Sequence, residues 1–471
     1  MGRSAVNRKS LSLCLVLVMP LLFWGCGSSS DAEAADAGPM AEPDMRRPST
    51  PPPAPPRSDW TKGVIEGDGS GLQPSIAARP DGRVGVAYFK TSPIIDGECS
   101  EIGGDGVPMR KRWPVRFAEL TGDTWQIETV HEPLLLGNPA GLSFAYAPDG
   151  TPVVSTMTGE PLEMFRYCGA NDVGVLTKDG DEWSLETAVT SSGEAATGMP
   201  GSDFGEVVGY WPALAFDNEG NPGVAYRDVH AGSIQGDDLT RADMEFAHRR
   251  GGWSTVAVDA GEGAGEYNQL LFDAQNRAVI LYHNPVEQTS DRVGLWLARA
   301  GAEPDSWEEH RIFDSKTTPR PSIALDPNSN TLVIAFYNPL EGRPYLARQD
   351  SAESITEWSF ERLGDDRYNE GIHPSVAFDP EGKLAIAWYR CNRVGTGGAC
   401  DPVEDALVFW WDADGEWIKE VVDTGDNGEC GYSPVLAFDA EGRAVVAYQC
   451  LRGMDEESAF ELDYARRKIL R

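Results

Sequence analysis

The chain has 471 residues, enough for a large hydrophobic core, and 24% of them are charged. It carries 40 basic against 74 acidic residues, a formal net charge of −34. Nucleic acids and anionic lipid surfaces are bound through basic patches, so this balance argues against both as electrostatic partners. Solubility or adaptation to salt is sufficient to explain the acidity.

The first 25 residues have the pattern of an export signal. Three basic residues precede an apolar run at 11–25 that is too short for a typical spanning helix. The run ends in Gly25–Cys26, which resembles a bacterial lipoprotein signal, although the two residues before Gly25 are bulkier than usual. The resemblance implies a lipidated Cys26 at the mature N-terminus; an ordinary cleaved signal with an incidental cysteine is the alternative. By resemblance to enteric bacteria, the absence of Asp at position 27 implies the outer membrane, on its periplasmic or cell-surface side.

Residues 26–58 predict a disordered tether. The segment is rich in Ser, Ala, Asp and Pro and poor in large apolar side chains, and a proline run at 51–56 would stiffen it. The folded domain is therefore expected over 59–471, held away from a membrane by the tether.

Seven similar segments follow, and each predicts a β-hairpin. An apolar run meets a D-x-x-G-type turn and continues into a β-branched run, which in most copies ends in an aromatic residue. Both strands are apolar without clean alternation, so we expect burial on both faces. The segments cover 73–88, 141–155, 211–226, 267–282, 320–337, 373–389 and 433–448.

A second hairpin pattern follows each of the first six segments. Its outer strand begins with a tryptophan, at Trp125, Trp183, Trp253, Trp307, Trp358 or Trp417. The repeating unit is thus four antiparallel strands, which we call A to D. Seven such units predict an all-β fold, a seven-bladed β-propeller.

The two ends of the domain complement each other. The seventh unit has a third strand at 462–470 but no Trp strand, whereas "DWTKGVIE" at 59–66 is similar to "EWIKEVVD" at 416–423. We therefore predict that the N-terminal strand completes the last blade and closes the ring. Closure hides sheet edges that an open solenoid, the alternative, would leave exposed.

Cysteine usage is consistent with export. Apart from Cys14 and Cys26, the cysteines are Cys99, Cys168, Cys391, Cys400, Cys430 and Cys450. The propeller hypothesis pairs Cys430 with Cys450 at the ends of one hairpin, Cys391 with Cys400 within one loop, and Cys99 with Cys168 between adjacent blades. No C-x-x-C occurs, so zinc and redox sites are not indicated.

The sequence contains no recognisable catalytic motif. It lacks G-x-S-x-G, H-E-x-x-H, a Walker loop and a G-x-G-x-x-G after a strand. Acidic Gly-rich segments at 66–71, 103–108 and 423–429 resemble calcium loops faintly, without the full ligand spacing. We therefore expect solvated loops and no metal or cofactor, with Ca²⁺ as the alternative.

Long and variable B–C loops mark one face of the propeller. They cover 89–114, 157–172, 228–243, 283–292, 338–343, 390–405 and 450–461. Antiparallel strands place the B–C and D–A loops on the same face, with all six mature cysteines, so we expect function there rather than mere tolerated insertions. The candidate ligand-binding residues lie where strand A starts and strand B ends: Arg227, Asp228, Tyr267, His283, Asn284, Arg320, Asn338, His373, Tyr389 and Arg390. Each alone would cap a strand or pair with a neighbour, but together they suit a sugar, a peptide or a small acid.

The segment "HPSVAFDPEGKLAIAWY" at 373–389 resembles the PSLA-x-D-x-x-G-x-x-x-IAY repeats of exported bacterial propeller proteins, over about 59–471. Those relatives mostly lack an assigned activity, so the resemblance implies a fold. Sialidase-like propellers are a more distant comparison, with three arginines on a carboxylate and a Tyr–Glu pair. Arg227, Arg320 and Arg390 would correspond to the arginines, but the Asp-box pattern is only partial and the Tyr–Glu pair cannot be placed.

Two functions remain open. The first is a monomeric, surface- or periplasm-displayed lipoprotein that binds an unknown protein or glycan partner and touches the membrane only through its anchor. The second is a glycan-active hydrolase or lyase. An enzyme should bring two carboxylates, or a Tyr–Glu pair, to the channel mouth, whereas a binding protein should show aromatic and polar groups without them.

Overall fold

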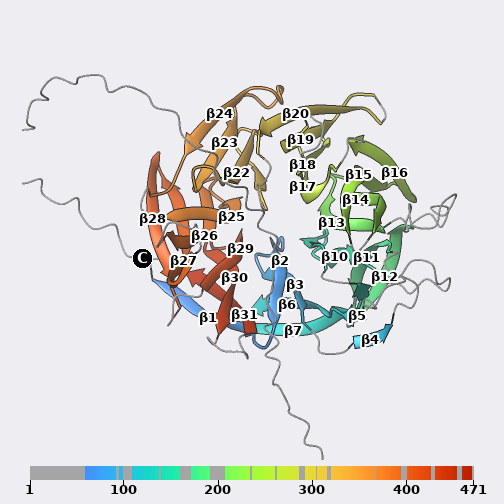
Figure 1. Cartoon of the computed structure of the whole chain (residues 1–471). Coiled ribbons are helices and arrows are strands. Elements are labelled where there is room, and N and C mark those ends of the chain that lie inside the picture. Colours follow the sequence, from blue (N-terminus) through green and yellow to red (C-terminus); the bar gives the residue numbers. More distant parts are fainter. Residues whose placement is uncertain are drawn as a thin grey trace, which may run out of the picture. The chain divides into compact units, whose positions relative to one another are not determined.

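The computed structural model describes residues 59–468, except for 92–94, 99–108, 137–138, 160–170, 191–206, 234–235, 260–262, 286–291, 304, 316–319, 366–367, 394–399, 426–429 and 453–458. The chain divides into Met1–Ala54 and Pro55–Arg471, and all described residues belong to the second unit. Seven four-stranded antiparallel sheets form a ring (Figure 1), which confirms the predicted seven-bladed propeller. The predicted signal and tether lie outside the described residues, among which no helix is long and apolar enough to cross a membrane.

Strands A to D follow one another in each blade. Blades 1 and 2 are β2 (Ser70–Ala78), β3 (Val84–Lys90), β6 (Val115–Thr121), β7 (Thr124–His131), and β9 (Leu142–Tyr146), β10 (Pro152–Met157), β11 (Val173–Asp179), β12 (Glu182–Val189). Blades 3 and 4 are β13 (Val207–Phe216), β14 (Pro222–Ser233), β15 (Gly236–Arg249), β16 (Trp253–Asp259), and β17 (Glu266–Phe272), β18 (Ala278–Asn284), β19 (Gly294–Ala300), β20 (Trp307–Phe313). Blades 5 and 6 are β21 (Ser322–Leu325), β22 (Leu332–Asn338), β23 (Arg343–Gln349), β24 (Trp358–Arg362), and β25 (Asn369–Phe378), β26 (Leu384–Arg393), β27 (Cys400–Ala413), β28 (Glu416–Asp423). Blade 7 is β29 (Cys430–Phe438), β30 (Ala444–Arg452), β31 (Ala459–Arg467) and β1 (Trp60–Glu66).

Some segments predicted as B–C loops contain paired strand. In blade 3, β14 and β15 pair as far as Ser233 opposite Gly236, and in blade 6, β26 and β27 pair as far as Arg393 opposite Cys400. A further sheet in the loops of blade 1 comprises β4 (Ile95–Glu98), β5 (Met109–Arg112) and β8 (Leu134–Leu136). Backbone pairing satisfies the N–H and C=O groups that a long irregular loop would leave to water.

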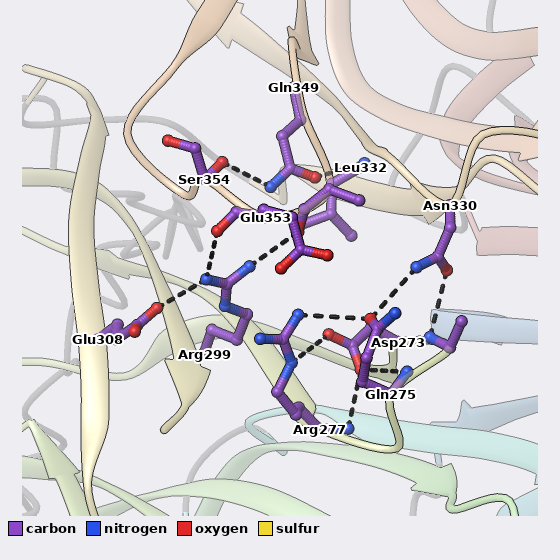
Figure 2. Close-up of polar contacts among 12 residues, drawn as sticks. Asp273, Gln275, Arg277, Arg299, Glu308, Asn330, Leu332, Gln349, Glu353 and Ser354 are labelled. Atoms are coloured by element: carbon purple, nitrogen blue, oxygen red, sulfur yellow. Dashed lines mark hydrogen bonds and ion pairs between the residues drawn. The ribbon is translucent and has the colours of Figure 1, made fainter. Parts of the chain in front are cut away.

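The A–B turns use the Asp of the D-x-x-G pattern as their organising acceptor. In blade 4, Asp273 Oδ1 accepts hydrogen bonds from the backbone N–H groups of Gln275 (3.0 Å) and Arg277 (2.8 Å), as Figure 2 shows. The Arg277 guanidinium donates to the other carboxylate oxygen at 2.7 Å. The turn of blade 5 contacts this one, because Asn330 Oδ1 accepts from the Ala274 N–H at 3.2 Å. The local Asx geometry explains why this turn recurs around the ring.

The hydrophobic core lies between blades. One buried cluster joins Leu281 and Leu297 of blade 4 to Ile334 and Phe336 of blade 5, all 0% exposed. The same two blades are also tied by Arg299, whose guanidinium donates to Glu308 in its own blade and to the backbone carbonyls of Ala352 and Glu353 in the next (Figure 2). Because each sheet is covered on both faces, both hairpin strands read as apolar runs.

The tryptophan that begins strand D packs onto strand C of the preceding blade. Trp183 contacts Phe117 with ring centroids 5.6 Å apart, and Trp307 contacts Phe246 at 5.6 Å. Trp125 contacts Tyr464 of the last blade at 5.5 Å. Edge-on aromatic contacts of this kind add to area burial, so the Trp pattern marks the outer seam between blades.

The predicted closure of the ring is confirmed. Strand β1 pairs antiparallel with β31, from Trp60 opposite Arg467 to Glu66 opposite Leu462. Side chains of β1 also reach blade 6, since Trp60 Nε1 donates to Glu420 at 2.7 Å and Lys62 pairs with Asp423 at 2.6 Å. The first strand therefore completes blade 7 and fastens it to its neighbour.

The structure contains the predicted Cys430–Cys450 disulfide, which joins the start of β29 to β30 with the Cα atoms 4.1 Å apart. Cys391 is also disulfide-bonded. The Cys99–Cys168 pair and the side chain of Cys400 lie outside the described residues.

Candidate functional site: the axial channel

The A strands of all seven blades enclose one cavity on the axis of about 310 Å³. Each blade contributes the same four consecutive positions of its hairpin segment, and this regularity follows from the repeat. The lining residues are 73–76, 141–144, 211–214, 267–270, 320–323, 373–376 and 433–436.

The first of the four positions has a left-handed backbone in every blade. The φ values are 50° at Gln73, 92° at Gly141, 51° at Trp211, 54° at Tyr267, 48° at Arg320, 51° at His373 and 46° at Ser433. Six of these residues are not glycine. A left-handed backbone is unfavourable for such residues, so it persists only because the surrounding structure holds it in place. Around this position strand A slips in register against strand B, for example between Ile372 and Ser375. The resulting bulge sets the direction of the side chain at the channel mouth.

Serines at the third position hold the A strands together. Ser75 Oγ accepts from the Phe144 N–H at 3.0 Å, and Ser375 Oγ accepts from the Leu436 N–H at 2.9 Å. The same bond occurs from Ser143 and Ser322 to the following blades. These bonds pair N–H groups of the innermost strand, which has no further strand on its axial side, and they join blades 1 to 3 and blades 5 to 7 along the channel wall.

Four consecutive blades present hydrogen-bond donors at the channel mouth: Trp211, Tyr267, Arg320 and His373. The Trp211 and Tyr267 rings contact each other with centroids 4.4 Å apart. Within the described part of the chain, the Trp211 indole N–H, the Tyr267 hydroxyl and the Arg320 guanidinium have no hydrogen-bond or ion-pair partner. The imidazole of His373 contacts Ser433 Oγ through Nδ1 at 3.3 Å. The arc therefore offers donors that the described protein does not use.

The channel carries one positive charge among its lining residues. Burial lowers the pKa of the Arg320 guanidinium, which Tyr267 partly offsets, but arginine stays protonated in proteins. Burial, and then the charge of Arg320, lower the pKa of His373 to about 3, so this imidazole is neutral at neutral pH. Burial and the nearby Glu266 raise the pKa of the Tyr267 hydroxyl. No Asp or Glu occurs among the described lining residues.

Arg227 and His283 lie away from the cavity and share the carboxylate of Glu266. Arg227 is 1% exposed and donates to Glu266 at 3.1 Å and to the Gly263 carbonyl at 3.0 Å. His283 Nδ1 lies 3.5 Å from Glu266. Glu266 was not among the candidates, although it directly precedes Tyr267 in the sequence. Asp228 and Asn284 are buried beside these residues on β14 and β18.

The remaining candidates also have structural roles. The guanidinium of Arg390 lies 4.3 Å from the centre of the Tyr368 ring. Tyr389 donates to Asp405 and stacks on Tyr432.

Asn338 organises the short B–C turn of blade 5, where its side chain accepts from the Leu340 N–H at 3.0 Å. Of the three arginines compared with the sialidase trio, Arg320 alone is a channel-lining residue.

Three tyrosine–carboxylate pairs join strand B of one blade to the end of strand D of the preceding blade. Tyr282 of blade 4 donates to Asp259 of blade 3 at 2.8 Å, and Tyr448 of blade 7 donates to Asp423 of blade 6 at 2.6 Å. Tyr88 of blade 1 donates to Glu66 of β1 at 2.7 Å in the same way. These acids end strand D and these tyrosines lie on strand B, so the pairs fasten blade to blade.

One group of potential metal ligands is present in the described residues. Asp423, Cys430, Cys450 and Asp463 each offer an atom within 4.8 Å of the others. The two sulfurs are joined in the disulfide, so neither is a thiolate, and Asp423 already pairs with Lys62. Of the calcium-like segments, 66–71 begins with Glu66, which accepts from Tyr88 and Lys90; 103–108 lies outside the described residues, as does 426–429.

Comparison with known proteins identifies no family for this chain. No protein-family model matches the chain, and no curated protein matches it. Among solved structures, a protein of unknown function from Dyadobacter fermentans has a TM-score of 0.45 at 11% identity, covering 88% of this chain and 99% of that one. The NanB sialidase from Streptococcus pneumoniae scores 0.44 at 12%, covering 86% and 70%, and an α-L-arabinofuranosidase from Fusarium graminearum scores 0.43 at 12%, covering 86% and 97%.

Proposed function

We propose that this protein is an exported binding protein whose propeller captures a small ligand in the axial channel. The observation that carries the proposal is the arc of unused donors on three consecutive blades, Trp211, Tyr267 and Arg320, in a channel without a described carboxylate. Glycoside hydrolysis requires a pair of carboxylates, or a tyrosine with an acid, at the reacting bond. The described lining of the channel contains Tyr267 but no Asp or Glu, which favours binding over hydrolysis.

We further propose that the propeller is displayed from the outer membrane by a lipid on Cys26 and the tether at 27–58. The apolar run before Cys26 supports export, and the buried Cys430–Cys450 disulfide suits an oxidising compartment. Cells fed labelled palmitate should label the parent protein and not Cys26→Ala. An unlabelled parent protein would show that the signal is of the ordinary cleaved type.

The binding function is tested with full-length protein in detergent against acidic, neutral and basic small molecules and glycans, by thermal shift. A ligand should raise the melting temperature of the parent and of Phe360→Asn, a control at an aromatic residue 50% exposed on β24. It should raise that of Trp211→Asn less, because Trp211 lines the channel. A ligand that stabilises all three equally would place binding outside the channel. Turnover of a glycoside would favour the hydrolase.

A further inference from the structure

Arg320 is half-buried at the cavity and differs from the fully buried arginines of the propeller. Arg227 donates to Glu266, and Arg299 donates to Glu308. Arg320 lines the cavity without an ion-pair or hydrogen-bond partner among the described residues. A desolvated guanidinium without a counter-charge is unfavourable in free energy. A bound anion would supply the missing counter-charge, so the site is suited to an anionic ligand.

We infer that the axial channel binds a monocarboxylate that carries a ring, with the carboxylate on Arg320 and the ring against Trp211 and Tyr267. This inference rests on the proposed binding function and adds the class of ligand. The planar guanidinium fork matches the two oxygens of a carboxylate, and the indole N–H and phenol O–H beside it supply neutral donors.

The charge of the site favours a single negative charge on the ligand. Arg320 is the one charged residue in the described lining, because His373 beside it is neutral. The whole chain carries a formal charge of −34, which repels anions at long range. A dicarboxylate or a phosphate dianion would bring a second charge without a cation in the channel wall to compensate it.

The apolar side of the site favours a ring. Trp211 and Tyr267 form a continuous aromatic surface, with ring centroids 4.4 Å apart. Prolines from five blades add apolar wall at the second position: Pro74, Pro212, Pro321, Pro374 and Pro434. A cavity of about 310 Å³ admits a small ligand and not a polymer chain.

The inference is tested by isothermal titration of the full-length protein with 3-phenylpropionate, its amide, benzylmalonate and acetate. The amide lacks the charge, benzylmalonate adds a second one, and acetate lacks the ring. We expect 3-phenylpropionate to bind at least about tenfold more tightly than each of the other three. Arg320→Gln should remove the preference over the amide. Arg348→Gln, a control on β23 of the same blade and outside the cavity lining, should retain it.

The outcomes separate the ligand class from the binding function. Equal binding of acid and amide, or an unchanged preference in Arg320→Gln, would overturn the carboxylate assignment. The same holds if none of the four probes binds at millimolar concentration. In each case a ligand found in the broader screen that depends on Trp211 would leave the proposed binding function standing. Equal binding of acetate and 3-phenylpropionate would overturn the role of the ring.

Discussion

His373 shows how one side chain depends on its neighbour across a blade boundary. It occupies the left-handed position of blade 6, and Arg320 occupies the same position of blade 5. Burial and this guanidinium together hold its pKa at about 3, against 6.5 for a histidine in water. The channel therefore keeps the same charge over the neutral and mildly acidic range.

This shift makes the stability of the fold depend on pH. The unfolded chain protonates His373 near pH 6.5, whereas the folded chain does so near pH 3. The unfolded state thus binds more protons between these values, so the free energy of unfolding falls as the pH falls, by at most about 1.4 kcal/mol per pH unit from this group. His373→Asn, which tolerates the left-handed backbone, should lose stability less steeply in urea titrations from pH 6.5 to 4. Parallel curves for parent and variant would contradict the assignment.

Sequence reasoning identified the channel-lining position only in part. Tyr267, Arg320 and His373 were candidates because they start strand A, and the structure places all three in the lining. Trp211 holds the same place in its own segment and was missed, although alignment of the repeats would have revealed it. Candidates at the end of strand B, such as Arg227, are not among the residues that line the cavity. Both faces of that strand are buried, so alternation does not tell which side chains face the axis.

At the scale of the element, the entry into strand A requires a close approach between blades. Gly371 precedes the left-handed His373 by two residues and has φ of 92°. A Cβ added there would lie 2.4 Å from Cβ of Pro344, on strand C of the preceding blade. A Cβ added at Gly431 would clash in the same way, 2.4 Å from the backbone nitrogen of Leu407. A glycine before the segment thus lets the bulge pass the neighbouring sheet.

The variants Gly371→Ala and Gly415→Ala distinguish the cost of backbone strain from the cost of the steric clash. Gly415 also has φ of 92°, but nothing lies within 4 Å of an added Cβ. Gly415→Ala should therefore lose about 1 kcal/mol from backbone strain alone, and Gly371→Ala about 1–3 kcal/mol more from the clash. Guanidinium unfolding of both variants measures this difference. If both variants lose the same free energy of unfolding, Pro344 of blade 5 moves aside without a measurable energetic cost.

The strands and turns could be predicted because the same sequence pattern recurs along the chain, once in each blade. Strand hairpins, Asp turns and the Trp strand were all found in the sequence, and the sheets confirm them. The extension of β14 and β15 into a predicted loop was not found, because segment 228–243 lacks the apolar pattern that marks buried strands. The two strands pair there through backbone hydrogen bonds. Such bonds do not require particular side chains, so the amino-acid sequence does not reveal them.

At the scale of the whole molecule, stability depends on closing a ring whose core lies between blades. Each blade buries its faces against two neighbours, so an open ring would expose two apolar faces at once. The last boundary joins the ends of the chain: β1 pairs with β31, and Tyr88 of blade 1 donates to Glu66 of β1. Loss of this boundary should propagate, as it does when an end repeat is removed from a repeat protein.

Deleting Trp60–Glu66 from the full-length protein tests this closure. The deletion exposes the edge of β31 and removes the Trp60–Glu420 and Lys62–Asp423 bonds. We expect a lower melting temperature, and loss of blade 7 before the rest, so that tryptophan fluorescence and far-ultraviolet circular dichroism no longer give one transition in guanidinium. The control deletes 27–50, within the predicted tether, and should unfold like the parent. If the β1 deletion melts at the temperature of the parent in a single coincident transition, the ring does not depend on the N-terminal strand.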